Sequence, residues 1–171
     1  MNRPLRPGFD GGEPEGAMGR DPLADFHSIP GHLFRRCRSR STAMFMDACR
    51  PYDITPDQYA VLKVVQIHPD IEQGEAGELT ALDASTVGQV IARLRKRGYL
   101  ATRRHGKRRL TSITAAGNAL LAELDPIVSA AQGRTLGHLT KREQRQLLRL
   151  MSKLVGASTR YYSAPKTRRR A

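Results

Sequence analysis

The stretch LDASTVGQVIARLRKRGYL, residues 82–100, decides the fold of this chain. Asp83 can cap a helix, because its carboxylate accepts hydrogen bonds from the free N–H groups of the first turn. Apolar residues then recur at i, i+3, i+4 and i+7, as Val87, Val90, Ile91 and Leu94. This spacing predicts an amphipathic helix with one apolar stripe facing the protein core.

The opposite face of the predicted helix is polar and basic. Ser85, Thr86, Gln89 and Arg93 lie on or beside it, with Lys96 and Arg97 at the C-terminal end. Hydroxyl and amide groups can hydrogen-bond to base edges in a DNA major groove, and basic groups can bind phosphates. The alternative is an ordinary solvated surface helix, which has the same pattern.

The next segment, ATRRHGKRRLTSIT at residues 101–114, favours the DNA-binding alternative. Strand-like residues on either side of His105-Gly106 predict a β-hairpin with Gly106 in its turn. Five cations surround this turn, and they are Arg103, Arg104, Lys107, Arg108 and Arg109. We expect these five side chains to contact the DNA backbone or minor groove.

The composition points to duplex nucleic acid as the partner. The 171 residues carry a net charge of +13, which favours a polyanionic partner. Aromatic residues make up only 5% and Trp is absent, so the stacking platforms of single-strand binders are poorly supplied. No apolar run approaches the roughly 20 residues that span a bilayer, and the N-terminus lacks a signal-peptide core. We therefore expect a cytoplasmic protein with no membrane partner.

The order of elements predicts a mainly α (α+β) fold, a winged helix-turn-helix with a small β-hairpin wing and a helical dimerisation region. Thr55-Pro56-Asp57-Gln58 forms a capping box that opens a helix, and a short helix over 72–79 precedes residues 82–100. Residues 1–24 are expected to be disordered and 163–171 to form a basic tail. The domain between them spans 25–162, with the winged helix at about 52–113 and dimerisation helices at about 29–50 and 114–160.

The helix predicted over 29–50 carries charge on its apolar face. Arg40 lies inside the apolar arc, with Arg36 and His32 at its edge. A charge there needs a partner, because burying it unpaired is costly. An ion pair is one explanation. The other is an anchor for a small acidic effector held between this helix and the winged domain.

Cysteines and histidines predict no metal site. Cys37 and Cys49 are twelve positions apart on one predicted helix, roughly 18 Å, too far for a disulfide within it. We expect both to be buried free thiols, with redox sensing as the alternative. The five histidines lack the close pairing of a zinc site, although one assembled only by the fold stays open.

These motifs together resemble the MarR family of bacterial transcriptional regulators over roughly residues 29–162. The resemblance rests on ITPDQYAVL (54–62), LTALDASTVGQVIARLRKRGYL (79–100), the Arg-rich wing and ITAAGNALL (113–121). It implies a homodimer bound to a palindromic operator, usually as a repressor released by a small ligand. For that ligand we expect an aromatic acid or its CoA thioester. The terminal helices favour a dimer independently, because their apolar faces exceed what a small winged domain can cover.

Three positions depart from the family pattern. The family's wing usually holds an aspartate, whereas RRHGKRR contains no acid, so we expect the wing arginines to lack a structural partner. Ala76-Gly77 stands where the family tends to have larger residues, which should loosen the short helix. Arg95 replaces a frequent glutamate and adds charge near the DNA.

Other classes of function remain as alternatives. A thiol-based redox sensor would use Cys37 or Cys49, and a nonspecific DNA-coating protein would use the charge alone. An enzyme is the least expected class, since the sequence contains no Gly-rich phosphate loop, GxSxG elbow or HExxH pair. No cofactor is expected.

Overall fold

The computed structural model describes residues 26–106 and 108–156. The predicted disordered segment 1–24, Lys107 and the basic tail 163–171 lie outside the described residues. The chain divides into two compact units, one ending at Arg38 and the other beginning at Ser39. Helix α2 contains residues of both units.

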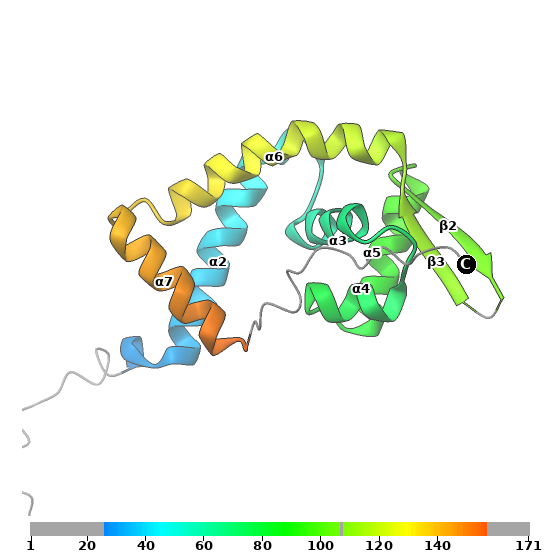
Figure 1. The fold of residues 1–171 in the computed structure, drawn as a ribbon. Helices are drawn as coiled ribbons and strands as arrows, with labels where there is room; N and C mark the ends of the chain where they lie inside the picture. The colour runs from blue at the N-terminus through cyan, green and yellow to red at the C-terminus, as the bar shows by residue number, and fades with distance from the viewer. Residues whose placement is uncertain (1–25, 107, 157–171) are drawn as a thin grey trace, which may run out of the picture. The chain divides into compact units, whose positions relative to one another are not determined.

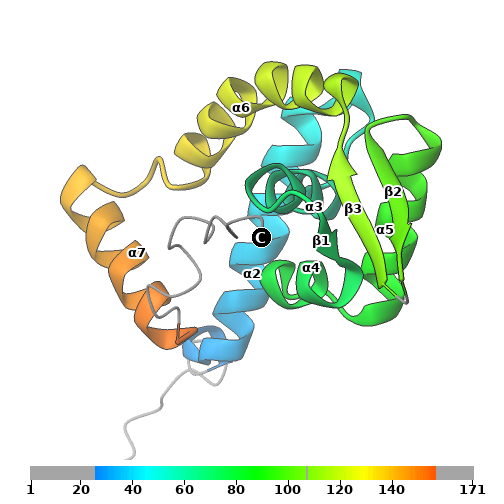
Figure 2. The ribbon, with the colours of Figure 1, turned by 45° about the vertical axis from the view of Figure 1, so that its right-hand side comes forward.

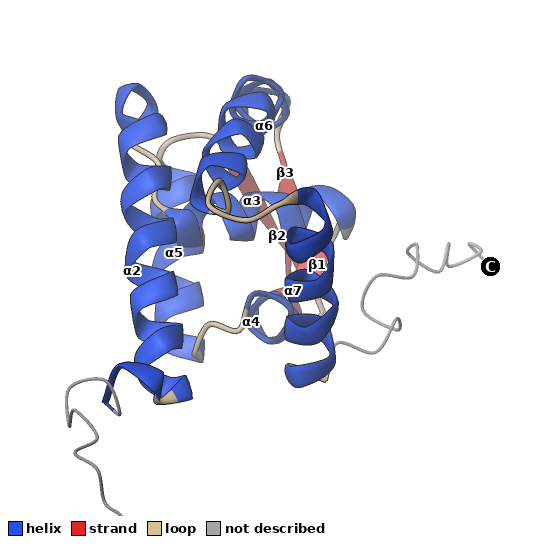
Figure 3. Ribbon diagram, turned by 90° about the vertical axis from the view of Figure 1, so that its left-hand side faces the viewer, coloured by secondary structure: helices blue, strands red, loops and turns tan. Residues whose placement is uncertain are grey.

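Helices dominate the described chain, and the strands form one small sheet (Figures 1 and 3). In order, the elements are α2 (Pro30–Ala48), the 3-10 helix η1 (Arg50–Tyr52), α3 (Pro56–Ile67), β1 (Ile71–Glu72), α4 (Gln73–Thr80), α5 (Ala84–Lys96), β2 (Leu100–His105), β3 (Arg108–Ile113), α6 (Ala115–Thr135) and α7 (Lys141–Leu154). This order confirms the predicted mainly helical winged helix-turn-helix.

The predicted helix caps at Thr55 and Asp83 are present, and α7 begins with a further capping box. The side chains of Thr55 and Gln58 form a reciprocal capping box at α3, and Thr140 forms another with Glu143 at α7. Asp83 accepts a hydrogen bond of 2.8 Å from the backbone N–H of Thr86 at the start of α5. A cap of this kind typically stabilises a helix by about 1 kcal/mol, so each fixes where its helix begins.

The expectation that Ala76-Gly77 loosens the short helix α4 is wrong. Both residues are buried. A Cβ added to Gly77 would lie 3.0 Å from the carbonyl oxygen of Leu82 and 3.3 Å from Cγ1 of Val87. A side chain at this position would push Leu82 or Val87 away by a few tenths of an ångström, so Gly77 favours close packing of α4 against the turn and α5.

The sheet is antiparallel, with β3 between β1 and β2 (Figure 2). β2 and β3 form the predicted hairpin, and Gly106 lies in its turn. The pairing sets Thr102 opposite Thr111 and Arg104 opposite Arg109. The two residues of β1 pair with β3, which fixes the base of the hairpin to the segment that follows α3.

The hydrophobic core joins α3, α4, α5 and α6. The predicted apolar stripe of α5 is buried. Val87 and Leu94 are fully inaccessible to solvent, and Val90 and Ile91 are nearly so. Phe45, at the end of α2, packs against Tyr59 of α3 with ring centroids 5.7 Å apart. Burying each such side chain contributes about 1.5–3 kcal/mol, so α5 is held by its apolar face while its other face stays free.

Candidate nucleic-acid interface

The outward face of α5 carries most of the predicted reading residues. Ser85, Gln89, Arg93 and Lys96 are exposed. Gln89 makes no side-chain hydrogen bond within the described part of the chain, so its amide is free to bind an external group. Thr86 differs, because its hydroxyl donates a 2.7 Å hydrogen bond to Asp83 as part of the helix cap. The structure therefore brings together a polar, basic helix face with Gln89 at its centre.

Arg97 has a structural contact that the prediction of a phosphate contact did not include. Its guanidinium donates hydrogen bonds to the backbone carbonyls of Tyr52, at 2.9 Å, and Asp53. It also lies over the Tyr99 ring, 5.2 Å from the centroid. These contacts fasten the C-terminal end of α5 to the segment before α3. We therefore leave Arg97 out of the DNA-contacting set.

The expectation that the wing arginines lack an acidic partner is wrong. Arg103 donates two hydrogen bonds to Asp70, at 2.9 and 3.3 Å, and Ser112 donates a third at 2.7 Å. Arg108 forms an ion pair with Glu72 at 3.0 Å. The acids stand at β1 and just before it, outside the hairpin. Hydrogen bonds from Arg103 and Ser112 hold the pKa of Asp70 below its ordinary value, so this carboxyl is ionised at neutral pH.

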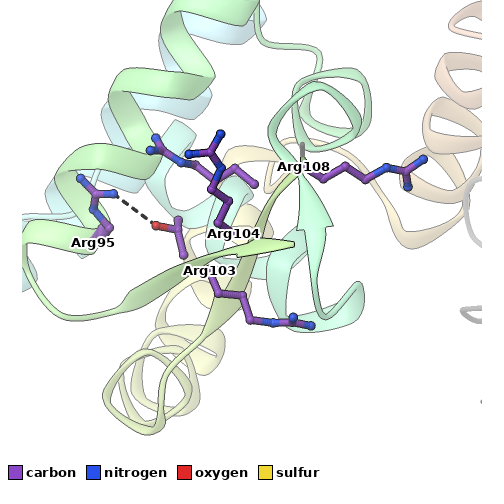
Figure 4. Close-up of a pocket in the computed structure, with 6 residues that line it drawn as sticks. Arg95, Arg103, Arg104 and Arg108 are labelled. Atoms are coloured by element: carbon purple, nitrogen blue, oxygen red, sulfur yellow. Dashed lines mark hydrogen bonds between the residues drawn. The ribbon is translucent and has the colours of Figure 1, made fainter. Parts of the chain in front are cut away.

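Three other arginines gather on the hairpin without an acid. Arg95 of α5 donates a 3.2 Å hydrogen bond to the hydroxyl of Thr102, and Arg104 and Arg109 face each other across the strands. They line a cavity of ≈ 560 Å³, together with Thr102, Arg103 and Arg108 (Figure 4). Among the described residues, Arg95, Arg104 and Arg109 form no salt bridge.

The predicted effector anchors lie on α2. In the first unit, His32 contacts His27 at 3.2 Å and Arg35 at 3.1 Å. Desolvation, followed by the charges of Arg35, His27 and Arg36, lowers the pKa of His32. In the second unit, Arg40 donates a 3.4 Å hydrogen bond to the carbonyl of Thr135, so its partner is a backbone group and not an acid.

The cysteines divide between the surface and the core. Cys49 is 1% exposed, as predicted, and burial raises the pKa of its thiol. The prediction of burial is wrong for Cys37, which is exposed. Within residues 26–106 and 108–156, no cluster of three or more His, Cys, Asp or Glu side chains could hold a metal ion. Over the same ranges, no helix combines the length and apolar character that crossing a membrane requires.

Sequence reasoning missed four residues that shape this interface. Three of them, Asp70, Glu72 and Gln73, were not named as site residues, and for Arg95 the charge near the DNA was expected but its hydrogen bond to Thr102 was not. Gln73 donates a 3.1 Å hydrogen bond to the carbonyl of Ala84, which ties the start of α4 to the start of α5. The partners of Asp70 and Glu72 are more than thirty positions away, so no local pattern reveals them. The one indication in the sequence was the absence of an acid in the wing, because its arginines could then pair only with acids outside the hairpin.

Comparison with known proteins agrees with this geometry. A model of the MarR family matches residues 52–109. The transcriptional regulator HosA of Escherichia coli O111:H- is 33% identical over 109 residues, covering 61% of this chain and 80% of HosA. The chain belongs to the MarR family. The HTH-type transcriptional repressor NicR of Pseudomonas putida is 30% identical over 129 residues, covering 73% of this chain and 81% of NicR.

A solved structure of the same fold extends the match. BpsR of Bordetella bronchiseptica, whose DNA binding is regulated by 6-hydroxynicotinic acid, superposes with a TM-score of 0.73 at 29% identity. The superposition covers 78% of this chain and 97% of BpsR. This MarR-family chain is therefore a transcriptional regulator with a winged helix, and the relatives named above are regulators rather than enzymes.

Proposed function

We propose that this protein is a homodimeric regulator, acting as a repressor, that binds a palindromic DNA operator and releases it when a small aromatic acid binds. The observation that carries the DNA-binding part is the free polar face of α5 beside the basic hairpin. Ser85, Gln89 and Arg93 would read base edges, whereas the Thr86 hydroxyl could act there only as an acceptor, because its proton is donated to Asp83. Lys96, Arg104 and Arg109 would bind backbone phosphates.

The homodimer is supported by the terminal helices. No residue of α7 is buried in the single chain, and Leu150, Met151 and Leu154 are 48%, 40% and 66% exposed. Apolar side chains repeated on one helix face at this exposure favour burial against a second copy. Two-fold symmetry would then place the two α5 helices roughly 34 Å apart, one turn of DNA.

Selection of bound duplexes from a random pool tests the DNA-binding proposal. An inverted repeat with half-sites about one helical turn apart is the expected product. Gln89→Ala should then cost about 1–3 kcal/mol on the selected site and little on random DNA. Arg145→Ala is the matched control, because Arg145 is exposed on α7, opposite its apolar face. A pool that yields no enriched sequence contradicts specific reading.

For the effector we propose an aromatic acid or its CoA thioester, with His32, Arg36 and Arg40 of α2 as anchors for the anionic groups of the ligand. The three basic residues follow each other at four-residue spacing in the sequence. The low pKa of His32 reflects desolvation and positive neighbours, an environment that an anion would relieve. The regulation of BpsR by 6-hydroxynicotinic acid supports this class of ligand.

Titration of 6-hydroxynicotinic acid against the protein–DNA complex tests the effector. Release by the acid, with no release by the corresponding uncharged amide, is the expected result. Arg36→Ala should weaken the response, whereas Arg38→Ala, an exposed arginine two positions along the same helix, should not. No release at millimolar acid would remove this part of the proposal.

Neither alternative function gains a comparable observation. Redox sensing through Cys49 is disfavoured by its burial and raised pKa, and unchanged DNA affinity after peroxide treatment would dismiss it for Cys37 as well. Nonspecific DNA coating would give similar affinities for the selected site and random duplexes at physiological salt.

A further inference from the structure

The two faces of the wing hairpin differ in charge compensation. Alternate residues of a strand point to opposite faces, so Arg103 and Arg108 do not share a face with Arg104 and Arg109. On the first face, Asp70 and Glu72 pair with Arg103 and Arg108. On the second face, the described residues supply no acid within ion-pair distance. The hairpin therefore presents one neutralised face and one strongly positive face.

Arg104 and Arg109 form a cross-strand pair of like charges. They are directly opposite each other in the antiparallel register, where Cβ atoms lie about 5 Å apart. Like charges in this position destabilise a sheet unless an anion lies between them. Both side chains are exposed, and neither forms a hydrogen bond or an ion pair among residues 26–106 and 108–156. The pair is thus arranged for a ligand from outside the chain.

Arg95 adds a third guanidinium from the neighbouring helix. Its hydrogen bond to Thr102 holds it against the same face of the hairpin, since Thr102 and Arg104 are two positions apart on β2. Figure 4 shows the bond, with Arg103 and Arg108 directed away from Arg95. Arg95, Arg104 and Arg109 line an open hollow of ≈ 560 Å³, and Arg103 and Arg108 contribute to its edge from the other face of the hairpin.

We propose that Arg95, Arg104 and Arg109 form one phosphate-binding site, which holds backbone phosphates of DNA and which a free oligophosphate can occupy in competition with DNA. Guanidinium groups bind phosphate oxygens through paired, charge-assisted hydrogen bonds, and a phosphate between Arg104 and Arg109 relieves their repulsion. The DNA half of this inference rests on the proposed function. The oligophosphate half adds a second input, separate from the effector anchors on α2.

Inorganic tripolyphosphate is the probe. Its binding to the DNA-free protein is measured by calorimetry, and its displacement of a labelled duplex by fluorescence anisotropy, both at ionic strength held constant with sodium chloride. Arg95→Ala and Arg104→Ala should each weaken tripolyphosphate binding about tenfold, the loss that one charge-assisted hydrogen bond produces. Arg145→Ala removes the same charge from α7 and should leave binding unchanged. Circular dichroism confirms that each variant is folded.

Each outcome decides between the possibilities. An equal loss in Arg145→Ala overturns the site in favour of diffuse attraction by net charge. Displacement of DNA no greater than that by matched chloride overturns the oligophosphate half, even if Arg95→Ala weakens DNA binding. Site-specific tripolyphosphate binding combined with failure to select any operator supports the phosphate site and contradicts the proposed regulator instead.

Discussion

Arg103 and Arg109 are both wing arginines, yet their substitution should affect DNA binding differently. Arg103 is paired with Asp70, so the pair is neutral as a unit, whereas Arg109 has no acid beside it in the described structure. Each lysine or arginine that neutralises a phosphate contributes about −0.9 to the slope of log affinity against log salt concentration. Arg109→Ala should therefore reduce the steepness of that slope by about 0.9 per protomer, and Arg103→Ala by much less.

Substitution of Asp70 should change the salt dependence of DNA binding in the opposite direction. Asp70→Asn removes the acid that neutralises Arg103, so nonspecific DNA binding should become tighter and its slope steeper by up to about 0.9 per protomer. The effect on stability should be small. The side chains of Arg103 and Asp70 are 55% and 43% exposed, and an ion pair this accessible contributes only about 0.2–1 kcal/mol. Changes in DNA binding larger than this cannot come from unfolding.

The assay is fluorescence anisotropy on a random duplex over a series of salt concentrations at pH 7. Because the pKa of Asp70 is lowered, its contribution is fully present above the ordinary carboxyl range, and is lost only as the pH falls through the lowered value. At pH 7 the Asp70 carboxyl stays ionised at every salt concentration, so changes in the slope of log affinity against log salt concentration reflect the phosphate contacts of the arginines. Equal slope reductions in Arg103→Ala and Arg109→Ala would refute the division of the wing into a neutralised and a positive face.

Four further predictions follow from packing and charge. Gly117→Ala should destabilise the protein by about 1–3 kcal/mol in urea unfolding, because a Cβ there would collide with the carbonyl of Tyr99. Gly133 lies on the same helix with open space around it, so Gly133→Ala should stabilise the protein by up to about 1 kcal/mol. Leu94→Ala should cost about 2–5 kcal/mol in the same measurement, since Leu94 is fully buried; a loss below about 1 kcal/mol would contradict its place in the core. Arg97→Ala should detach the end of α5 and increase hydrogen exchange at the backbone amides of the segment before α3, which an unchanged exchange pattern would refute. Effector affinity should rise as the pH falls from about 8 to about 6, because the pKa of His32 is lowered in the free protein and a bound carboxylate would raise it. Calorimetry in two buffers would reveal the uptake of a proton on binding, and the absence of uptake would exclude His32 as an anchor.

The sequence predicted what local pattern determines. The caps at Thr55 and Asp83 and the stripe from Val87 to Leu94 depend on residues within one helix, and all of them are present in the structure. The wing contacts were not predictable in this way. Asp70 and Arg103 are separated by 33 positions and meet only because β1 pairs with β3. Gly77 likewise lowers the helix propensity of an isolated α4, and its advantage is visible only where α4 packs closely against Leu82 and Val87.

Net charge alone does not distinguish a specific regulator from a DNA-coating protein; the placement of charge does. If all the wing cations were equally available, a chain of +13 would bind any duplex through its phosphates. Asp70 and Glu72 instead compensate Arg103 and Arg108, and backbone carbonyls hold Arg97. Within the described part of the winged domain, the cations without an acidic partner include Arg104 and Arg109 on one face of the hairpin, and Arg93 and Lys96 on the outward face of α5. Nonspecific attraction is thereby reduced at positions where it would add no sequence information, so a larger share of binding depends on the groups around Gln89.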